Sequence, residues 1–154
     1  MSDNGDTMAD LKRVETFNVD EVNARLPLVR RIVEDLRNSW IRCKQIRTRL
    51  RNFQRESVDN HSVELRETMR RLREEEQLLE REITNLEEEA NQIGAIVRDP
   101  RRGVVDFFSV RDGHLIYLVW THGEHQVAFW RKLDARLIDK KPISEGSDLS
   151  SKMK

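Results

Sequence analysis

The sequence predicts an α+β fold, in which a long antiparallel two-helix coiled-coil hairpin is followed by a small antiparallel β-meander of three to four strands. Two patterns indicate this fold. From Asn18 to Gly94 the apolar residues recur at steps of three and four, which is the spacing of a helical seam. After Gly94 the apolar residues alternate with a period of two, and β-branched and aromatic types become frequent, as in strands.

The length of 154 residues suits a single domain with loose ends. Both ends of the chain are polar and lack apolar periodicity, which is typical of disordered tails. We therefore expect a disordered N-terminal tail over 1–16, a single domain over 17–143 and a disordered C-terminal tail over 144–154. Within the domain, the helical hairpin is expected over 18–94 and the β-meander over 95–135.

The start of the first helix is marked by two local signals. Asn18 is a good N-cap, and Glu21 follows three residues later, which together make a capping box. Phe17 and Val22 occupy the two positions of a hydrophobic staple around that cap. Pro27 removes one intrahelical hydrogen bond, so we expect the helix to bend there and to continue.

The second helix is expected to begin at Ser62, after a five-residue turn over 57–61 that makes the two helices antiparallel. Gly94 closes it at the position after the C-cap, where glycine is common. Pairing outward from the turn brings together residues whose numbers sum to about 118 or 119. The apolar layers that result are Leu65–Phe53, Met69–Leu50, Leu72–Ile46, Leu79–Trp40, Ile83–Leu36, Leu86–Val33, Ala90–Val29 and Ile93–Leu26.

One layer of this seam is polar, because Glu76 faces Cys43. A carboxylate in a seam destabilises the fold unless it reaches water or a cation, and Arg42 or Arg47 lies within reach. Such a layer can also fix the register of the two helices.

The meander is expected to contain strands over 103–110, 114–121 and 125–133, with 95–100 as a fourth, edge strand. The segments 111–113 and 122–124 are hairpin turns, since each contains a glycine between two strand-like runs. So small a sheet is unstable alone and must pack on another element. Leu28 and Ile32, which lie off the seam, and Phe17 are the expected contacts.

Composition excludes some classes of protein. The 28 basic residues balance the 28 acidic ones, so no overall field draws the chain to nucleic acid or to a membrane. Cys43 is the single cysteine, which forbids an internal disulfide and fits a reducing compartment. The longest apolar run, over 115–120, is too short to cross a bilayer. A cytoplasmic protein without membrane contact is therefore expected.

The segment Tyr117–Trp130 brings His122, Glu124 and His125 close together in sequence between two tryptophans. A metal site needs three or four converging ligands, whereas these residues flank a turn that usually leaves them solvated. We therefore favour the interpretation that this segment is the turn of a β-hairpin over the interpretation that it is a metal site. Cys43 has no histidine near it in sequence, so a packed thiol is favoured over a nucleophile. We expect no catalytic residue, no cofactor and no metal.

A ligand or partner surface on the meander is a second interpretation of the same residues. At period two, Tyr117 faces away from Trp120, so some aromatic rings point away from the helices. The candidate residues of this surface are Asp106, Tyr117, Trp120, Glu124, His125 and Trp130.

Charge is unevenly distributed along the hairpin. From Trp40 to Arg73 ten basic residues meet four acidic ones, and from Glu74 to Asp99 nine acidic residues meet two basic ones. The favoured interpretation is that these charges pair across the helices. The alternative is that the basic tip contacts a polyanion. The candidate contacts are Arg42, Arg47, Arg51, Arg55, Arg66 and Arg70.

The stretches "FNVDEVNARLPLVR" and "GVVDFFSVRDGHLIYLVWTHGEHQVAFWRKLD" resemble a bacterial family known only as domain of unknown function 2203. The resemblance covers about Phe17 to Ile143 and supports the fold, while it implies no activity. Three positions depart from the family's pattern. Val119 replaces a cysteine, Phe108 stands where proline is usual, and Arg131 and Lys132 stand where the family has His-Glu. If the family's Trp-His pair binds or catalyses anything, this chain lacks it.

Together these observations favour a non-enzymatic interaction or scaffold protein that uses the helical hairpin and the β-module as binding surfaces. Its protein partner is unknown, and a homodimer is an open alternative. RNA or DNA binding through the basic hairpin tip is the second hypothesis. A small-ligand or metal-binding site on the β-meander is the third.

Overall fold

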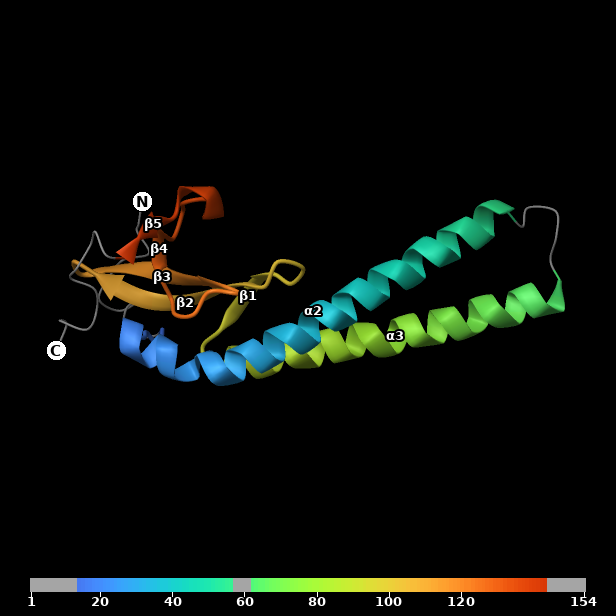
Figure 1. The fold of residues 1–154 in the computed structure, drawn as a ribbon, viewed down its shortest axis with the longest axis horizontal. Helices are drawn as coiled ribbons and strands as arrows, with labels where there is room; N and C mark the ends of the chain where they lie inside the picture. Colours follow the sequence, from blue (N-terminus) through green and yellow to red (C-terminus); the bar gives the residue numbers. More distant parts are fainter. Residues whose placement is uncertain (1–13, 57–61, 144–154) are drawn as a thin grey trace.

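The computed structural model describes residues 14–56 and 62–143. The expected turn over 57–61 and most of the two expected tails lie outside these residues. The elements are α2 (Val19–Glu56), α3 (Val63–Gln92), β1 (Ile96–Asp99), β2 (Val104–Arg111), β3 (His114–Thr121), β4 (Phe129–Lys132), a 3-10 turn η1 (Leu137–Asp139) and β5 (Lys141–Pro142). Figure 1 shows the two long helices side by side and the sheet at one end of them. The predicted α+β fold, a helical hairpin followed by an antiparallel meander, is confirmed.

Helix α2 begins where the capping box places it. The backbone N–H of Asn18 donates to Glu21 Oε1 at 2.8 Å, and the N–H of Glu21 donates to Asn18 Oδ1 at 2.8 Å. Phe17 and Val22 are both buried in one apolar cluster, as the staple requires. In Figure 1 the first turns of α2 run at an angle to the rest, which agrees with the bend expected at Pro27 inside the helix.

Helix α3 is also bounded by local hydrogen bonds. The Ser62 hydroxyl accepts from the N–H of Leu65 at 3.0 Å. At the other end the N–H of Gly94 donates to Asn91 and that of Ala95 donates to Ala90, which is the hydrogen-bond pattern of a Schellman motif. Gly94 has a φ of +89°, and a Cβ there would lie 2.3 Å from the Phe17 ring. The end of α3 is therefore fixed against the start of α2.

The two helices share two apolar clusters. The first, near the sheet, includes Val29 and Val33 of α2 and Ala90 of α3. The second lies farther out and contains Ile46, Leu50 and Leu72, with Phe53, Met69 and Leu79 packed against it. We call residues 38–56 and 62–81 the arm, because they extend beyond the sheet (Figure 1).

The sheet is a five-stranded antiparallel meander with its strands in chain order. The register pairs Val105 with Trp120 and Phe107 with Leu118, and this face packs in the cluster shared with the helices. Ile32 and Phe17 belong to that cluster, as expected. The expectation that Leu28 joins them is wrong, because Leu28 is 40% exposed. Ile32 lies four residues beyond Leu28 and its side chain alone reaches the core.

Two features of the sheet differ from the sequence analysis. Strand β4 begins at Phe129 rather than His125, because the preceding backbone bonds to α2 instead of β3. The N–H of Val127 donates to Asn23 Oδ1 at 2.9 Å, and the guanidinium of Arg30 donates to the His125 carbonyl. The sheet also gains the unpredicted edge strand β5, which pairs with β4.

No helix in the described part of the chain combines the length and the apolar character that a membrane span requires.

Candidate functional site

The most concentrated polar group of the sheet lies on the face turned away from the helices. Asp106 of β2 is fully buried there. Arg98 of β1 donates to Asp106 Oδ2 at 2.8 Å, and Arg131 of β4 donates to the same oxygen. Arg131 is buried as well, and its other terminal nitrogen donates to the Ala135 carbonyl at 2.6 Å. Two guanidinium groups thus neutralise one buried carboxylate.

Tyr117 lies on the same face, opposite Arg131 in the strand register. The guanidinium carbons of Arg98 and Arg131 lie 5.0 Å and 4.6 Å from the centre of its ring. Burial lowers the pKa of Arg98, but the hydrogen bond to Asp106 and the charges of Tyr117 and Asp106 outweigh it, and the pKa is raised. Arg98 therefore stays cationic and remains an ion-pair partner of Asp106.

The two tryptophans of the candidate surface lie on the opposite face. Trp120 is fully buried and Trp130 nearly so, and both belong to the core cluster shared with the helices. The Trp120 indole N–H donates to the Glu124 carbonyl at 3.0 Å, and the Glu124 carboxylate accepts from the N–H of Thr121 at 3.0 Å. These contacts close the turn after β3, so Glu124 has a structural role.

The histidines near this turn do not converge. His122 lies 3.3 Å from Glu34 Oε2 and 3.4 Å from Arg37, through its two ring nitrogens, whereas His125 is exposed. Within the described ranges, Cys43, Glu76 and Glu80 of the arm are the residues that come close enough together to bind a metal ion. The segment Tyr117–Trp130 therefore brings no such ligand set together among the described residues.

The two carboxylates near Cys43, those of Glu76 and Glu80, already bind a cationic side chain of the protein. Arg47 donates to Glu76 Oε2 at 2.7 Å and also to Glu80. Burial raises the pKa of the Cys43 thiol, and the charge of Arg47 offsets only part of that effect. The expected layer of Glu76 against Cys43 is thus present, and Arg47 is the cation that neutralises it. Because a neutral buried thiol is a poor nucleophile, Cys43 is a packing residue.

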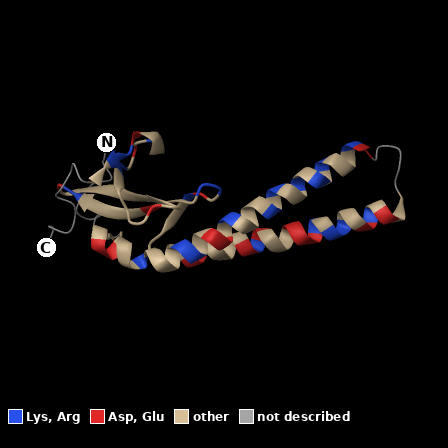
Figure 2. Ribbon diagram, viewed as in Figure 1, with Lys and Arg blue, Asp and Glu red and all other residues tan. Residues whose placement is uncertain are grey.

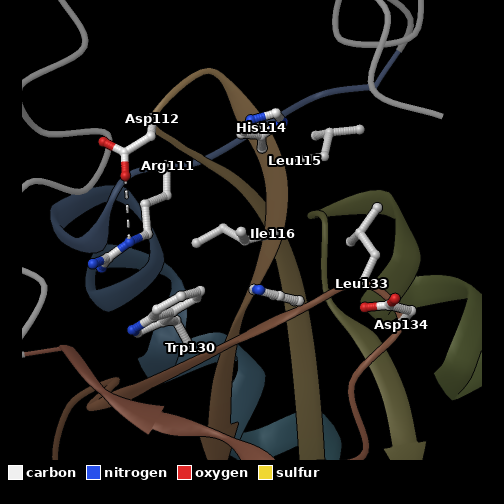
Figure 3. Close-up of a pocket in the computed structure, with 9 residues that line it drawn as sticks. Arg111, Asp112, His114, Leu115, Ile116, Trp130, Leu133 and Asp134 are labelled. Carbon is white, nitrogen blue, oxygen red and sulfur yellow. Dashed lines mark ion pairs between the residues drawn. The ribbon is translucent and has the colours of Figure 1, made fainter. Parts of the chain in front are cut away.

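A pocket of about 560 Å³ lies beside Trp130, at the end of the sheet that carries the turn between β2 and β3 (Figure 3). The guanidinium of Arg111 lies over the Trp130 ring at 4.2 Å from its centre, and Arg111 Nε is 3.9 Å from Asp112. Other lining residues are His114, Leu115, Ile116, Lys132, Leu133 and Asp134. The pocket combines one aromatic wall with groups of both charges.

Several charges of the arm pair with each other, and Figure 2 shows the basic residues of α2 beside the acidic and basic residues of α3. Arg42 donates to Glu75 at 2.9 Å across the hairpin, as Arg47 does to Glu76. Within α3, Arg70 pairs with Glu67 and Glu74. Of the expected polyanion contacts, Arg42, Arg47 and Arg70 are therefore engaged inside the protein. Arg51 bonds to Thr48 Oγ1 at 3.3 Å, and Arg55 and Arg66 are exposed.

Sequence reasoning named Asp106 and Tyr117 but missed the two arginines that hold them. The signal for Arg131 was available, because alternation along β4 places it on the face opposite to Trp130. Arg98 had no local signal, since its partner depends on the register between β1 and β2. The six candidate residues are thus divided among a buried ionic cluster, the core and an exposed turn.

The family model described as "Uncharacterized conserved protein (DUF2203)" matches residues 15–143. Comparison with curated proteins and with solved structures gives no match.

Proposed function

Because the chain belongs to the DUF2203 family, whose description states no activity, we propose its function from geometry: it is a non-enzymatic interaction protein that binds a macromolecular partner through the arm. The sheet is the base that holds the arm. The observation that carries the proposal is the contrast between the two parts, since the Asp106 cluster of the sheet is buried and its charges are paired, while the arm presents charged and apolar groups to solvent.

The ionic cluster around Asp106 supports the proposal that the sheet is a structural base. Asp106 is a fully buried carboxylate of β2, and two arginines bind one of its oxygens inside the sheet. A general acid or base needs access to its substrate. The buried Asp106 carboxylate does not have that access. The cluster acts as a structural tie between β1, β2 and β4.

The arm supports the proposal because large apolar side chains on it are exposed to solvent. Ile41 of α2 is 40% exposed and Leu78 of α3 is 59% exposed, although both are large apolar side chains. The arm is about 28 Å long, because each helix contributes 19 residues to it at about 1.5 Å per residue. Ordering a projection of this length costs conformational entropy, and stability alone does not explain that cost. The exposed apolar side chains and the length of the arm are well suited to contact a partner.

Site-specific photo-crosslinking in the native cytosol tests this proposal. A benzophenone amino acid replaces Ile41 or Leu78 on the arm, and His114 or Ile138 on the sheet as matched exposed positions. We expect discrete covalent adducts of defined mass from the arm positions and weak, diffuse products from the sheet positions. Adducts from the sheet positions alone would place the binding surface on the meander and overturn the proposal.

The pocket beside Trp130 favours a second candidate function, the binding of a small ligand. It is large enough to hold a small molecule, and it involves Trp130 but none of the other five candidate residues. Its test is differential scanning fluorimetry of the full chain against a panel of small anions and aromatic acids. A rise in Tm that Trp130→Leu abolishes would support this function, and no rise with any compound would reject it.

A further inference from the structure

In the C-terminal half of α2, every charged residue from Arg37 to Arg55 is basic. From Arg37 to Arg55 the sequence holds seven arginines and lysines and no acidic residue. Three of the seven are engaged: Arg42 and Arg47 pair with glutamates of α3, and Arg37 donates to the Arg101 carbonyl at 3.0 Å. The remaining four, all exposed, form no ion pair with any residue that the structure describes. They are Lys44, Arg49, Arg51 and Arg55.

Three of these cations follow one side of the helix. Lys44, Arg51 and Arg55 lie on a single face of α2 together with Thr48, because the four positions are spaced by four, three and four residues. The hydrogen bond from Arg51 to Thr48 Oγ1 at 3.3 Å shows that these two residues are neighbours on that face. We call Lys44, Arg51 and Arg55 the basic stripe. Its length from Lys44 to Arg55 is about 16 Å at 1.5 Å per residue.

At the sheet end of the basic stripe lies a groove of about 630 Å³. It is lined by Trp40, Ile41, Arg42, Lys44, Gln45, Thr48 and Arg49 of α2 and by Arg101 of the turn between β1 and β2. Four of these eight residues are cationic and none is acidic. Figure 2 shows that turn as a basic loop projecting from the sheet on the side of the arm.

Arg101 is held in place by its backbone rather than by its side chain. Its carbonyl accepts from Arg37, and its N–H donates to Asp99 Oδ1 at 3.1 Å. At Gly103 the turn comes so close to its surroundings that an added Cβ would lie 2.6 Å from His122 Cβ and 3.0 Å from Val33 Cγ1. The backbone of this turn is therefore fixed, and the Arg101 guanidinium, which forms no ion pair with the described residues, lines a groove that is formed before any ligand arrives.

The groove also has an aromatic wall. The sequence pairing placed Trp40 in the seam opposite Leu79, but its side chain is only half-buried and lines the groove. The Lys44 ammonium lies 5.3 Å from the centre of the Trp40 ring. Because Lys44 is exposed, its ammonium can leave the ring for an anion at little cost. Trp40 therefore places an aromatic ring among the exposed cations of α2.

We propose that this groove binds single-stranded nucleic acid, with a base stacked on Trp40, phosphates on Lys44, Arg49 and Arg101, and the strand continuing along the basic stripe towards Arg55. The proposal rests on the proposed function, because it names the class of partner that the arm binds. An unpaired base supplies a flat face and each nucleotide supplies one negative charge, which is the combination that the groove presents. An acidic peptide supplies the charge without a regular series of flat faces.

Fluorescence anisotropy of the full chain with a labelled 15-nucleotide RNA of mixed sequence tests this inference, at several salt concentrations. The charge variant is Lys44→Glu/Arg49→Glu, and its matched control is Arg66→Glu/Arg73→Glu, two exposed cations of α3 with the same change in net charge. We expect the groove variant to weaken binding at least tenfold, and its salt slope to fall by about 1.4, since each phosphate contact to a single strand contributes about 0.7. The control is expected to change the Kd less than threefold.

Trp40 provides a second readout. Trp120 and Trp130 are buried, so quenching of indole emission by the RNA reports mainly on Trp40. Trp40→Phe keeps a ring and is expected to bind within threefold of the natural chain, whereas Trp40→Leu is expected to lose at least fivefold, as stacking loss predicts. Circular dichroism of each variant shows whether the helices are retained.

Four results would overturn the inference: no binding of the RNA, equal losses in the two charge variants, equal affinity for Trp40→Phe and Trp40→Leu, or equally tight binding of a 15-residue polyglutamate. The crosslinking experiment separates this failure from that of the proposed function. If RNA does not bind and Ile41 and Leu78 still give discrete adducts, only the inference is lost. If the arm positions give no adducts at all, the proposed function is lost.

Discussion

The guanidinium of Arg131 donates to the carboxylate of Asp106 across the β-sheet, where both side chains are buried. The resemblance to the family predicts a histidine at position 131, where this chain has arginine. In this chain it closes the ionic cluster on the outer face of the sheet.

Arg131→Leu is therefore expected to destabilise the protein by about 3 kcal/mol, because it leaves Asp106 buried with only Arg98, which is more exposed, as partner. Asp106→Asn combined with Arg131→Leu should recover part of this loss, since the uncompensated charge is removed. Urea unfolding followed by circular dichroism measures both. The exposed pair Arg136–Asp139 provides the control, because Arg136→Leu should cost less than about 1 kcal/mol. A double variant less stable than Arg131→Leu would contradict this account.

Gly94→Ala tests the junction between the helices. The substitution meets a φ of +89° and places a methyl group 2.3 Å from the Phe17 ring, so the ring must move out of the core. We expect a loss of at least about 2 kcal/mol from strain and repacking together. Gly113→Ala is the matched control, with a φ of +79° but nothing within 4 Å, and should cost about 1 kcal/mol. Equal losses at the two positions would show that the Phe17 contact contributes nothing.

Cys43 reports on the opening of the arm, because it is the single thiol of the chain. Burial raises its pKa and shields it, so its reaction with a disulfide reagent at pH 8 should be at least about tenfold slower than in urea. Leu72→Ala removes a buried contact of the outer cluster and should accelerate the reaction. Ile138→Ala, at an exposed position of the sheet end, should not. Rapid labelling of the natural chain would mean that the arm is open.

The arm should lose stability in acid. The hydrogen bond from Arg42 lowers the pKa of Glu75 below its ordinary value of 4.5, and that from Arg70 does the same for Glu67. Since these folded-state values are depressed, the stabilisation is present above pH 4.5 and is lost as the pH falls through the lowered values. Urea midpoints at pH 6, 4.5 and 3 measure this loss. Arg42→Gln should flatten the dependence, and an unchanged profile would exclude the Arg42–Glu75 pair as a cause.

The helix ends were predicted from sequence because local hydrogen bonds determine them. Asn18 with Glu21, Ser62 and Gly94 each act within a few residues, so their positions in the sequence are sufficient. The apolar seam between the helices was also predictable from sequence, because a regular spacing of apolar residues allows few registers between the two helices. Trp40 is the exception, because a large ring at the edge of a seam can turn towards the core or away from it.

The parts that could not be predicted depend on contacts between distant segments. Leu28 and Ile32 have the same chemistry and lie one helical turn apart, and only the position of the sheet makes one buried and the other exposed. Likewise, the backbone before β4 is not a strand because Asn23 and Arg30 of α2 bond to it. Asp106 was predicted to lie on a ligand or partner surface, but in the structure its buried carboxylate binds Arg98 and Arg131, which come from other strands.

The placement of the sheet at one end of the hairpin has a consequence for how such proteins can diverge. The apolar core of the meander packs on the base of the two helices, and each strand bonds to its neighbour in the chain. Seven residues added to each helix near the tip would keep every apolar layer in phase and would leave the base untouched, while moving the turn outward by about 10 Å. The length of the arm can therefore change during evolution in steps of seven residues per helix, without any change in the sheet at its base.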